Sequence, residues 1–389
     1  MAYKFKKQIF GFMDMLRFAG MVPRRREIFA NAPATPLPTT YKVNITAKAL
    51  HPGKQFVKIA AIDAHADDLK TFKFVADGVK TKKLATFRSG QYITITANVG
   101  DSRVTRAYTL ASSPLDALEK GFYTVTIKGV GILSDYMCAQ AKVGDVLEIS
   151  EPSGDFCYEP LRDRKHIVAV AGGVGITSLL SMAKSVYEGT EDCTMTFFYC
   201  VASKHELLFT DELDAMNGDK IKVVYVVEKG DAEGCEKGLM SADLVKKYVD
   251  KPFTLFMCGS DGMYEFVKKE LAPFNLRIKD VHTSPNGIQD RKVEKKATYN
   301  LTVVMRENKY IVPCRNDETL LVAMERAGIH APSKCRAGGC GFCRSKLVSG
   351  EYTAAPNRDK RRIADFKFGW VHPCCIYPDS DITIEVPQG

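Results

Sequence analysis

Long uncharged apolar runs are missing from this sequence of 389 residues. Because a helix needs roughly 20 apolar residues to cross a membrane, no transmembrane segment is expected. The first apolar stretch, residues 9–21, contains Asp14 and Arg17 and is not followed by a small-residue cleavage site, so a secretion signal is not expected either. Internal repeats and low-complexity tracts are also absent. These absences predict a cytoplasmic globular protein.

The composition is ordinary for a globular chain, with 45% apolar and 26% charged residues, and the length suffices for two or three domains. The twelve cysteines are spread widely and crowd together only between Cys335 and Cys343. This distribution favours a reduced compartment with one metal site over a disulfide scaffold.

The formal charge of +9 is placed unevenly. Residues 1–40 contain seven Lys or Arg against Asp14 and Glu27, so more than half of the excess lies in this basic N-terminal extension. Its apolar residues recur at roughly helical spacing. The extension could dock a partner, touch the surface of an anionic membrane or form a disordered tail. Nucleic-acid binding is not needed to explain the charge, and none is expected.

Two patterns follow along the chain. Residues 41–160 contain short alternating segments separated by Gly, Pro, Asp and Ser, which predicts an antiparallel barrel with strands near 41–47, 56–62, 92–97, 122–127 and 146–150. Residues 161–283 alternate apolar runs (166–171, 195–201, 221–227 and 253–257) with helical stretches, which is typical of a parallel sheet.

Residues 284–297 are polar, contain Pro285 and Gly287, and are predicted to be a flexible linker. At about 20 Å in span, such a linker would let the last domain swing. Residues 298–389 then show strand patterns at 299–305 and 382–386, a helix at 318–327 and a cysteine-rich loop.

That loop carries the strongest motif. Cys335, Cys340 and Cys343 are spaced four and then two residues apart, and another cysteine follows about 30 residues later, which is the ligand spacing of a plant-type 2Fe-2S cluster. A structural zinc site usually takes its ligands from two close pairs and fits less well. Cys374 and Cys375 both qualify as fourth ligand, but adjacent residues of an extended segment point to opposite sides, so only one can face a cluster.

A second motif lies in the barrel region. Arg106, Tyr108 and Thr109, expected at the start of a strand, supply a guanidinium for a pyrophosphate, a flat ring to cover an isoalloxazine and a hydroxyl for a ring nitrogen. On its own this pattern also fits an exposed strand with a core tyrosine.

A third motif separates an apolar run from a helical pattern. Gly172, Gly173, Gly175 and Thr177 form a glycine-rich turn that would let a dinucleotide pyrophosphate approach a helix N-terminus. Taken alone, a glycine-rich turn is a weak indication of nucleotide binding.

Together these segments resemble the ferredoxin-NAD(P) reductase superfamily fused to a C-terminal plant-type ferredoxin, and most closely the reductases that serve oxygenases and hybrid-cluster proteins. The resemblance selects Cys374 as the fourth cluster ligand. It also identifies Gly131 and Ser134 as a turn that opens a helix at Asp135 and binds the pyrophosphate of FAD rather than FMN. By the same resemblance, Cys258 and Gly259 border the nicotinamide.

The sequence differs from the family pattern at several positions. Ser178 and Ser260 stand where relatives commonly have proline, and His282, Thr283 and Ser284 replace the usual acidic-aromatic ending of the nucleotide domain. The residue beside the flavin at the domain junction is therefore left open. Ser203 and Lys204 do not decide between NADH and NADPH.

The resemblance implies a multidomain fold. It would comprise an antiparallel β-barrel flavin domain, an α/β parallel-sheet nucleotide domain and an α+β β-grasp ferredoxin domain. The implied activity is electron transfer from NADH or NADPH through FAD to the 2Fe-2S cluster and on to a protein acceptor. Thr109 would bond flavin N5 and Cys258 would position the nicotinamide.

Two other functions fit the same motifs. One is a stand-alone diaphorase that reduces flavins, quinones or ferric chelates, and the other is a redox-sensing module without catalysis. Basic residues around the cysteine loop suggest an acidic redox partner, although they also suit a solvated surface.

Overall fold

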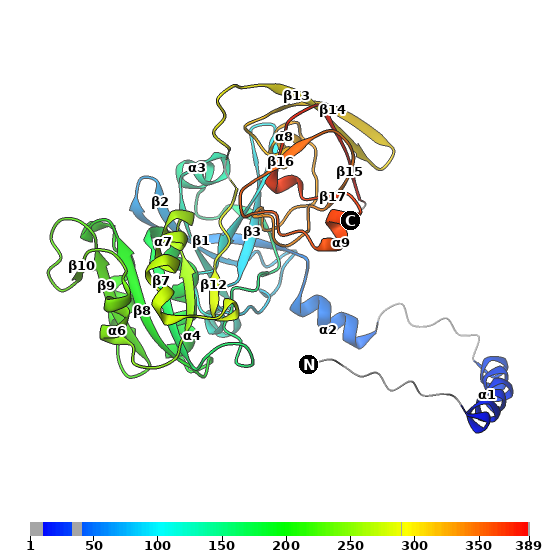
Figure 1. Ribbon diagram of the computed structural model, residues 1–389, viewed down its shortest axis with the longest axis horizontal. Helices are drawn as coiled ribbons and strands as arrows, with labels where there is room; N and C mark the ends of the chain where they lie inside the picture. Colours follow the sequence, from blue (N-terminus) through cyan, green and yellow to red (C-terminus); the bar gives the residue numbers. More distant parts are fainter. Residues whose placement is uncertain (1–10, 33–40, 289, 388–389) are drawn as a thin grey trace. The chain divides into compact units, whose positions relative to one another are not determined.

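The computed structural model describes residues 11–32, 41–288 and 290–387, and the chain divides into two units, residues 1–47 and 48–389 (Figure 1). In the first unit, α1 (Phe12–Ala30) agrees with the predicted helical spacing and has no buried side chain. The strand predicted at residues 41–47 is wrong, because this segment begins α2 (Lys42–Leu50). The described side chains of α2 are exposed, so the segment packs against no neighbouring strand. Without such a neighbour, an alternating sequence does not form a strand.

The domain predicted to bind a flavin, called the flavin domain below, is a six-stranded antiparallel sheet in the order β4-β3-β6-β1-β2-β5. The strands are β1 (Lys54–Ala66), β2 (Leu69–Ala76), β3 (Tyr92–Val99), β4 (Ser102–Thr109), β5 (Phe122–Lys128) and β6 (Val146–Ser150). The backbone N–H of Ala111 donates to the carbonyl of Thr124 at 2.8 Å, which draws the two edges of the sheet together. A π-helical turn (Asp116–Lys120) and α3 (Ile132–Ala139) complete the domain, and α3 buries Leu133 and Met137.

The nucleotide domain is a parallel sheet in the order β10-β9-β8-β7-β11-β12, drawn in green and yellow in Figure 1. Its strands are β7 (His166–Gly172), β8 (Thr194–Val201), β9 (Ile221–Val227), β10 (Glu236–Lys237), β11 (Thr254–Cys258) and β12 (Val281–Thr283). Its helices are α4 (Ile176–Tyr187), α5 (Thr210–Met216), α6 (Ala242–Tyr248) and α7 (Asp261–Glu270).

Both faces of this sheet are covered. Along β7, Ile167 and Ala169 pack with α4 and α5, whereas Val168 and Val170 pack with α6 and α7. Because both faces are buried, the strands read as continuous apolar runs in the sequence, and all four predicted strands of this domain are confirmed.

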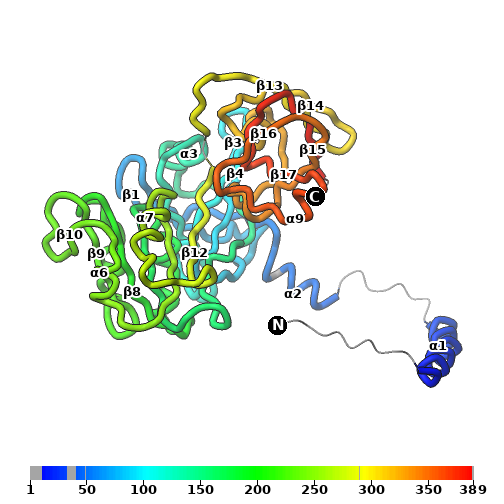
Figure 2. Tube along the Cα trace, viewed as in Figure 1, coloured from blue at the N-terminus to red at the C-terminus, as the bar shows by residue number. Residues whose placement is uncertain are grey.

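The ferredoxin domain, yellow-gold to red in Figure 2, is a mixed sheet in the order β14-β13-β19-β15-β17 with a separate pair β16-β18. Only β13 and β19 run parallel. The strands are β13 (Thr298–Met305), β14 (Asn308–Arg315), β15 (Ser345–Ser349), β16 (Tyr352–Ala354), β17 (Trp370–Val371), β18 (Ile376–Pro378) and β19 (Ile382–Val386). The helices are α8 (Leu320–Arg326) and the short α9 (Ile363–Lys367).

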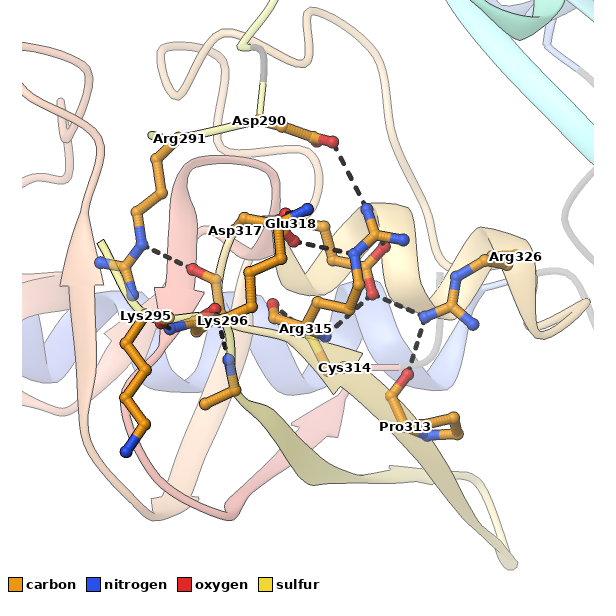
Figure 3. Close-up of polar contacts among 12 residues, drawn as sticks. Asp290, Arg291, Lys295, Lys296, Pro313, Cys314, Arg315, Asp317, Glu318 and Arg326 are labelled. Carbon is orange, nitrogen blue, oxygen red and sulfur yellow. Dashed lines mark hydrogen bonds and ion pairs between the residues drawn. The ribbon is translucent and has the colours of Figure 1, made fainter. Parts of the chain in front are cut away.

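The segment 284–297 is held rather than free, unlike the linker that its composition predicts. Arg291 donates from Nε to the carbonyl of Asn316 at 2.6 Å (Figure 3). The same guanidinium binds Asp379 at 2.7 Å. Arg315 reaches back to Asp290 at 3.4 Å. At the other end, Asn286 donates to the carbonyl of Gly259 at 2.7 Å. The described residues of this segment therefore contact the domains on both sides.

Candidate functional site

The nucleotide-binding loops meet at a crossover of the parallel sheet. The chain proceeds outward from β7 through β8 to β9 and then returns to the other side of β7 with β11. Ligands of open parallel sheets bind at such a switch point, outside the carboxyl ends of the strands. β7 ends at Gly172 and the turn after it contains Gly173 and Gly175, while β11 ends at Cys258 and is followed by Gly259. The structure therefore brings together the residues that the sequence predicted for the nicotinamide nucleotide.

Glycine is required where these loops touch. A Cβ atom on Gly175 would overlap the carbonyl of Cys258, and one on Gly172 or Gly259 would overlap the sulfur of Met263. Gly173 instead has a φ of +52° and open space above it. The two loops are thus in direct backbone contact, with an unobstructed side at Gly173.

The thiol of Cys258 is buried beneath this contact. Burial raises the pKa of the Cys258 thiol, and the hydroxyls of Ser178 and Ser284 offset part of the rise. The thiol therefore stays neutral near pH 7, and it is a buried packing group rather than an activated nucleophile. Ser178 and Ser284 both stand at positions where the family pattern is broken, and neither contact was predicted from the sequence.

Replacing Gly175 with alanine is expected to raise the KM for the nicotinamide nucleotide by about tenfold. The added methyl group must push the loop away from Cys258, and overpacking of this kind costs about 1–3 kcal/mol, where 1.4 kcal/mol is tenfold in affinity. Steady-state kinetics with ferricyanide measure the effect. Gly218→Ala is the matched control, because a Cβ atom there meets nothing within 4 Å. Equal KM values for the two variants would contradict the close approach.

The flavin motif lies at the end of β4, not at the start of a strand as predicted. The hydroxyl of Thr109 lies 2.5 Å from that of Thr177 at the beginning of α4. Nearby, Ser181 donates to the carbonyl of Ser112 at 2.7 Å. The structure therefore joins the predicted flavin and nucleotide motifs at the junction of their domains.

The predicted turn at Gly131 also lies beside this strand. Gly131 is the N-cap of α3, so the helix begins at Ile132, earlier than the predicted Asp135. The hydroxyl of Ser134 donates to the Gly131 carbonyl at 2.9 Å and accepts from the N–H of Val130 at 3.0 Å. These bonds hold a helix N-terminus without a side-chain cap, an arrangement suited to phosphate oxygens. Burial raises the pKa of Tyr108, which keeps its phenol neutral.

Arg106 has a partner that the sequence did not reveal. Its guanidinium binds Glu325 of α8 at 2.8 and 3.1 Å, and the backbone N–H of Thr105 donates to the same carboxylate at 2.9 Å. Arg336, the residue after Cys335, binds Glu325 from the other side at 3.2 and 3.4 Å. One carboxylate therefore connects the flavin motif to the cysteine loop. Contact of Arg106 with a pyrophosphate stays a prediction.

This three-residue contact is almost closed to solvent. Glu325 and Arg336 are each only 9% exposed. Burial lowers the pKa of Arg336 to about 10, so the guanidinium is still charged at neutral pH. Nothing in the spacing of the sequence could have paired residues 219 positions apart.

The cysteine loop packs on the flavin domain through further contacts. Lys334 forms an ion pair with Glu151. Tyr92, which opposes Thr109 on β3, has its pKa raised by burial and by the nearby charges of Cys335 and Cys340. A cavity of about 300 Å³ lies beside these contacts, lined in part by Arg103, Glu148 and His330. Polar contacts therefore contribute much of the attachment.

The four predicted cluster cysteines lie in two pairs. A hydrogen bond from the thiol of Cys340 lowers the pKa of Cys335 and raises that of Cys340. A hydrogen bond from the thiol of Cys343 likewise lowers the pKa of Cys374 and raises that of Cys343. Within the described residues, no three or more His, Cys, Asp or Glu side chains converge on a single metal position. Two pairs of thiolates, one pair for each iron, are nevertheless the ligand set that a 2Fe-2S cluster requires.

Cys375 lies beside Cys374, and the two thiols are in hydrogen-bond contact. The thiol of Cys375 donates to the carbonyl of His372 at 3.4 Å. Residues 373–375 form a 3-10 turn rather than the extended segment that the sequence argument assumed. Gly338, with a φ of +74°, brings the loop so close to Arg358 that a Cβ atom would overlap its carbonyl. The loop thus wraps tightly around the cysteines.

Three domain models match the chain in sequence order. They are the oxidoreductase FAD-binding domain over residues 57–158, the oxidoreductase NAD-binding domain over 169–269 and the 2Fe-2S iron-sulfur cluster binding domain over 304–379. The chain is a reductase of the ferredoxin reductase type. FAD, a nicotinamide nucleotide and a 2Fe-2S cluster are the cofactors of this reductase.

Known proteins resemble the reductase over most of its length. It is 24% identical over 369 residues to the glycine betaine monooxygenase reductase subunit of Chromohalobacter salexigens, covering 88% of this chain and 98% of that protein. It is 26% identical over 305 residues to the NADH oxidoreductase HCR of Escherichia coli, covering 77% of this chain and 88% of that protein.

The fold of phthalate dioxygenase reductase superposes with a TM-score of 0.63 at 22% identity, covering 87% of this chain and 98% of that one. The predicted multidomain fold is confirmed by this likeness and by the iron-sulfur domain match. Among the described residues, no helix combines the length and the apolar character that crossing a membrane would require.

Proposed function

We propose that this reductase delivers electrons from NADH or NADPH, by way of FAD and the 2Fe-2S cluster, to an oxygenase component. The observation that carries the proposal is the continuity of the three sites. Thr177 of the nucleotide loop contacts Thr109 of the flavin motif, and Tyr92 opposite Thr109 lies beside the cysteine loop. Several relatives are named as reductase subunits of monooxygenases, which supports an oxygenase as acceptor.

The residues divide into three groups in this proposal. The nucleotide is bound at Gly172, Gly173, Gly175, Thr177, Cys258 and Gly259. FAD is held at Arg106, Tyr108, Thr109, Gly131 and Ser134, with Thr109 placed to bond flavin N5. The cluster is held by Cys335, Cys340, Cys343 and Cys374. When bound, FAD accepts a hydride and releases electrons singly, which matches a two-electron donor to a one-electron cluster.

The protein's own part is to position the reacting groups. The neutral thiol of Cys258 stands where the nicotinamide would lie, and burial prevents it from competing as a nucleophile. The Thr109 hydroxyl can rotate to donate or accept, since its partner in the structure is another hydroxyl. Cytoplasmic location and contact of residues 1–40 with a membrane surface or partner remain predictions.

An anaerobic titration with NADH and then NADPH, followed in the ultraviolet and visible range, tests the proposal. Bleaching of the flavin band together with the cluster bands is the expected result, and the nucleotide that acts at lower concentration is the physiological donor. Bleaching of the flavin alone would contradict transfer to the cluster and indicate a stand-alone diaphorase. A preparation that binds zinc, or binds no flavin, would overturn the function altogether.

A further inference from the structure

We propose that the surface around α9 docks an electron-acceptor protein whose own contact surface is acidic. This surface, the α9 patch, consists of Ile363, Phe366, Phe368, Lys360, Arg362 and Lys367. The inference rests on the proposed function and adds to it the place and the chemistry of the acceptor's contact.

The patch concentrates exposed apolar side chains. Ile363, Phe366 and Phe368 are 89%, 68% and 61% exposed, respectively. They lie on or next to a helix of only five residues. Contiguous exposed apolar side chains surrounded by polar ones mark interaction sites, and aromatic residues are enriched at the core of protein interfaces.

The helix is attached by its polar side. Asp365 is buried, where it binds Nε of Arg344 at 2.7 Å and Nε of Arg362 at 3.1 Å. A surface helix normally buries its apolar side chains and exposes its charged ones. Here a carboxylate is inside and two large apolar side chains are outside. Folding alone does not explain this inversion, whereas a binding partner would.

The outward charge of the patch is positive. Of its neighbouring carboxylates, Asp365 is buried, and Asp359 is bound by Arg361. Lys360, Arg362 and Lys367 are exposed. A second copy of the chain would meet like charge there, whereas a surface rimmed with carboxylates would be complementary and would be drawn in over long range.

The patch adjoins the cluster loop. Arg344 directly follows Cys343, and its guanidinium lies 3.9 Å over the ring of Trp370 while binding Asp365. On the same loop Cys340 and Phe342 are exposed. A protein seated on α9 would therefore lie next to Arg344, the residue that directly follows the predicted ligand Cys343. An anionic membrane could also bind a basic apolar surface, but membrane binding does not require that the surface adjoin the cluster loop.

Charge reversal tests the assignment. The variant Lys360→Glu/Lys367→Glu leaves the Asp365 contacts intact. The full-length holoprotein, reduced with dithionite, is mixed by stopped flow with cytochrome c whose lysines have been succinylated, which makes it acidic. We expect the second-order rate constant to fall by about tenfold at low ionic strength, and the difference to shrink with added salt. Native, basic cytochrome c should not lose rate.

Two controls match these changes. Arg306→Glu/Lys309→Glu alters the net charge equally on the exposed β13–β14 turn and should leave the rate nearly unchanged. Phe366→Ala should weaken binding of the succinylated protein, while Ile311→Ala, at a site 63% exposed on β14, should not.

An equal loss in both double variants, or none in either, would overturn the inference. Patch-dependent binding to anionic phospholipid vesicles with unchanged cytochrome rates would overturn it in favour of a membrane. Because dithionite supplies the electrons, these outcomes are separate from any failure of NADH or NADPH to reduce the cluster.

Discussion

Replacing Cys340 with serine is expected to abolish reduction of native cytochrome c while NADH-driven reduction of ferricyanide continues. Cys340 lies in hydrogen-bond contact with Cys335, so its removal takes one thiolate from one half of the cluster. Bound iron should fall from about two atoms per chain toward none. Iron and sulfide analysis, the visible spectrum and the two steady-state rates measure the effect.

Cys375→Ser is the matched control for this experiment. Cys375 is as deeply buried as Cys374, and its thiol contacts both the carbonyl of His372 and the thiol of Cys374. The resemblance to plant-type ferredoxins is what selects Cys374 as the ligand. We expect the variant to keep its iron and its cytochrome c activity. Loss of iron in Cys375→Ser with retention in Cys374→Ser would reverse the ligand assignment. Persistence of cytochrome c reduction in Cys340→Ser would show that electrons leave from the flavin.

Replacing Glu325 with glutamine should destabilise the protein by about 3–5 kcal/mol, the usual cost of leaving buried charges without their counter-charge. The side chain keeps its size, but Arg106 and Arg336 lose the carboxylate between them. Urea denaturation measures the stability. Flavin reduction by NADH should proceed near the wild-type rate, whereas the subsequent reduction of the cluster should slow, because the loop is no longer held to β4.

Glu307→Gln controls for the loss of one carboxylate, since Glu307 is exposed in the same domain. It should change stability by less than about 0.5 kcal/mol. Wild-type stability in Glu325→Gln would contradict a stabilising role for the contact of Glu325 with Arg106 and Arg336. Lower stability with unchanged transfer to the cluster would show that Glu325 supports the fold without positioning the loop.

The sequence predicted what local chemistry determines. Backbone conformation requires the glycines after β7, and ligation of a cluster sets the cysteine spacing. Burial on both faces of the sheet makes the strands of the nucleotide domain continuously apolar. The strand predicted at residues 41–47 failed because alternation alone cannot supply a neighbouring strand. Arg106 shows a second limit, since its motif was recognised but its partner Glu325 lies in another domain.

The same limit applies to the linker. Its composition is that of a mobile segment, yet Arg291 and Asn286 fasten it at both ends. Such contacts depend on where distant backbone carbonyls lie after folding. The spacing of residues in the sequence therefore does not predict them. The α9 patch was equally hidden, because a sequence does not show that Asp365 is inside and Phe366 outside.

The register of β3 and β4 has a consequence for electron movement. Tyr92 and Thr109 are directly opposed, so both side chains rise from the same face of one sheet, roughly 5 Å apart at their Cα atoms. The threonine predicted to bond the flavin and the tyrosine beside the cysteine loop are therefore joined by one hydrogen-bonded strand pair. The spacing between these two residues is consequently set by secondary structure, and it persists through any rearrangement that leaves the two strands paired.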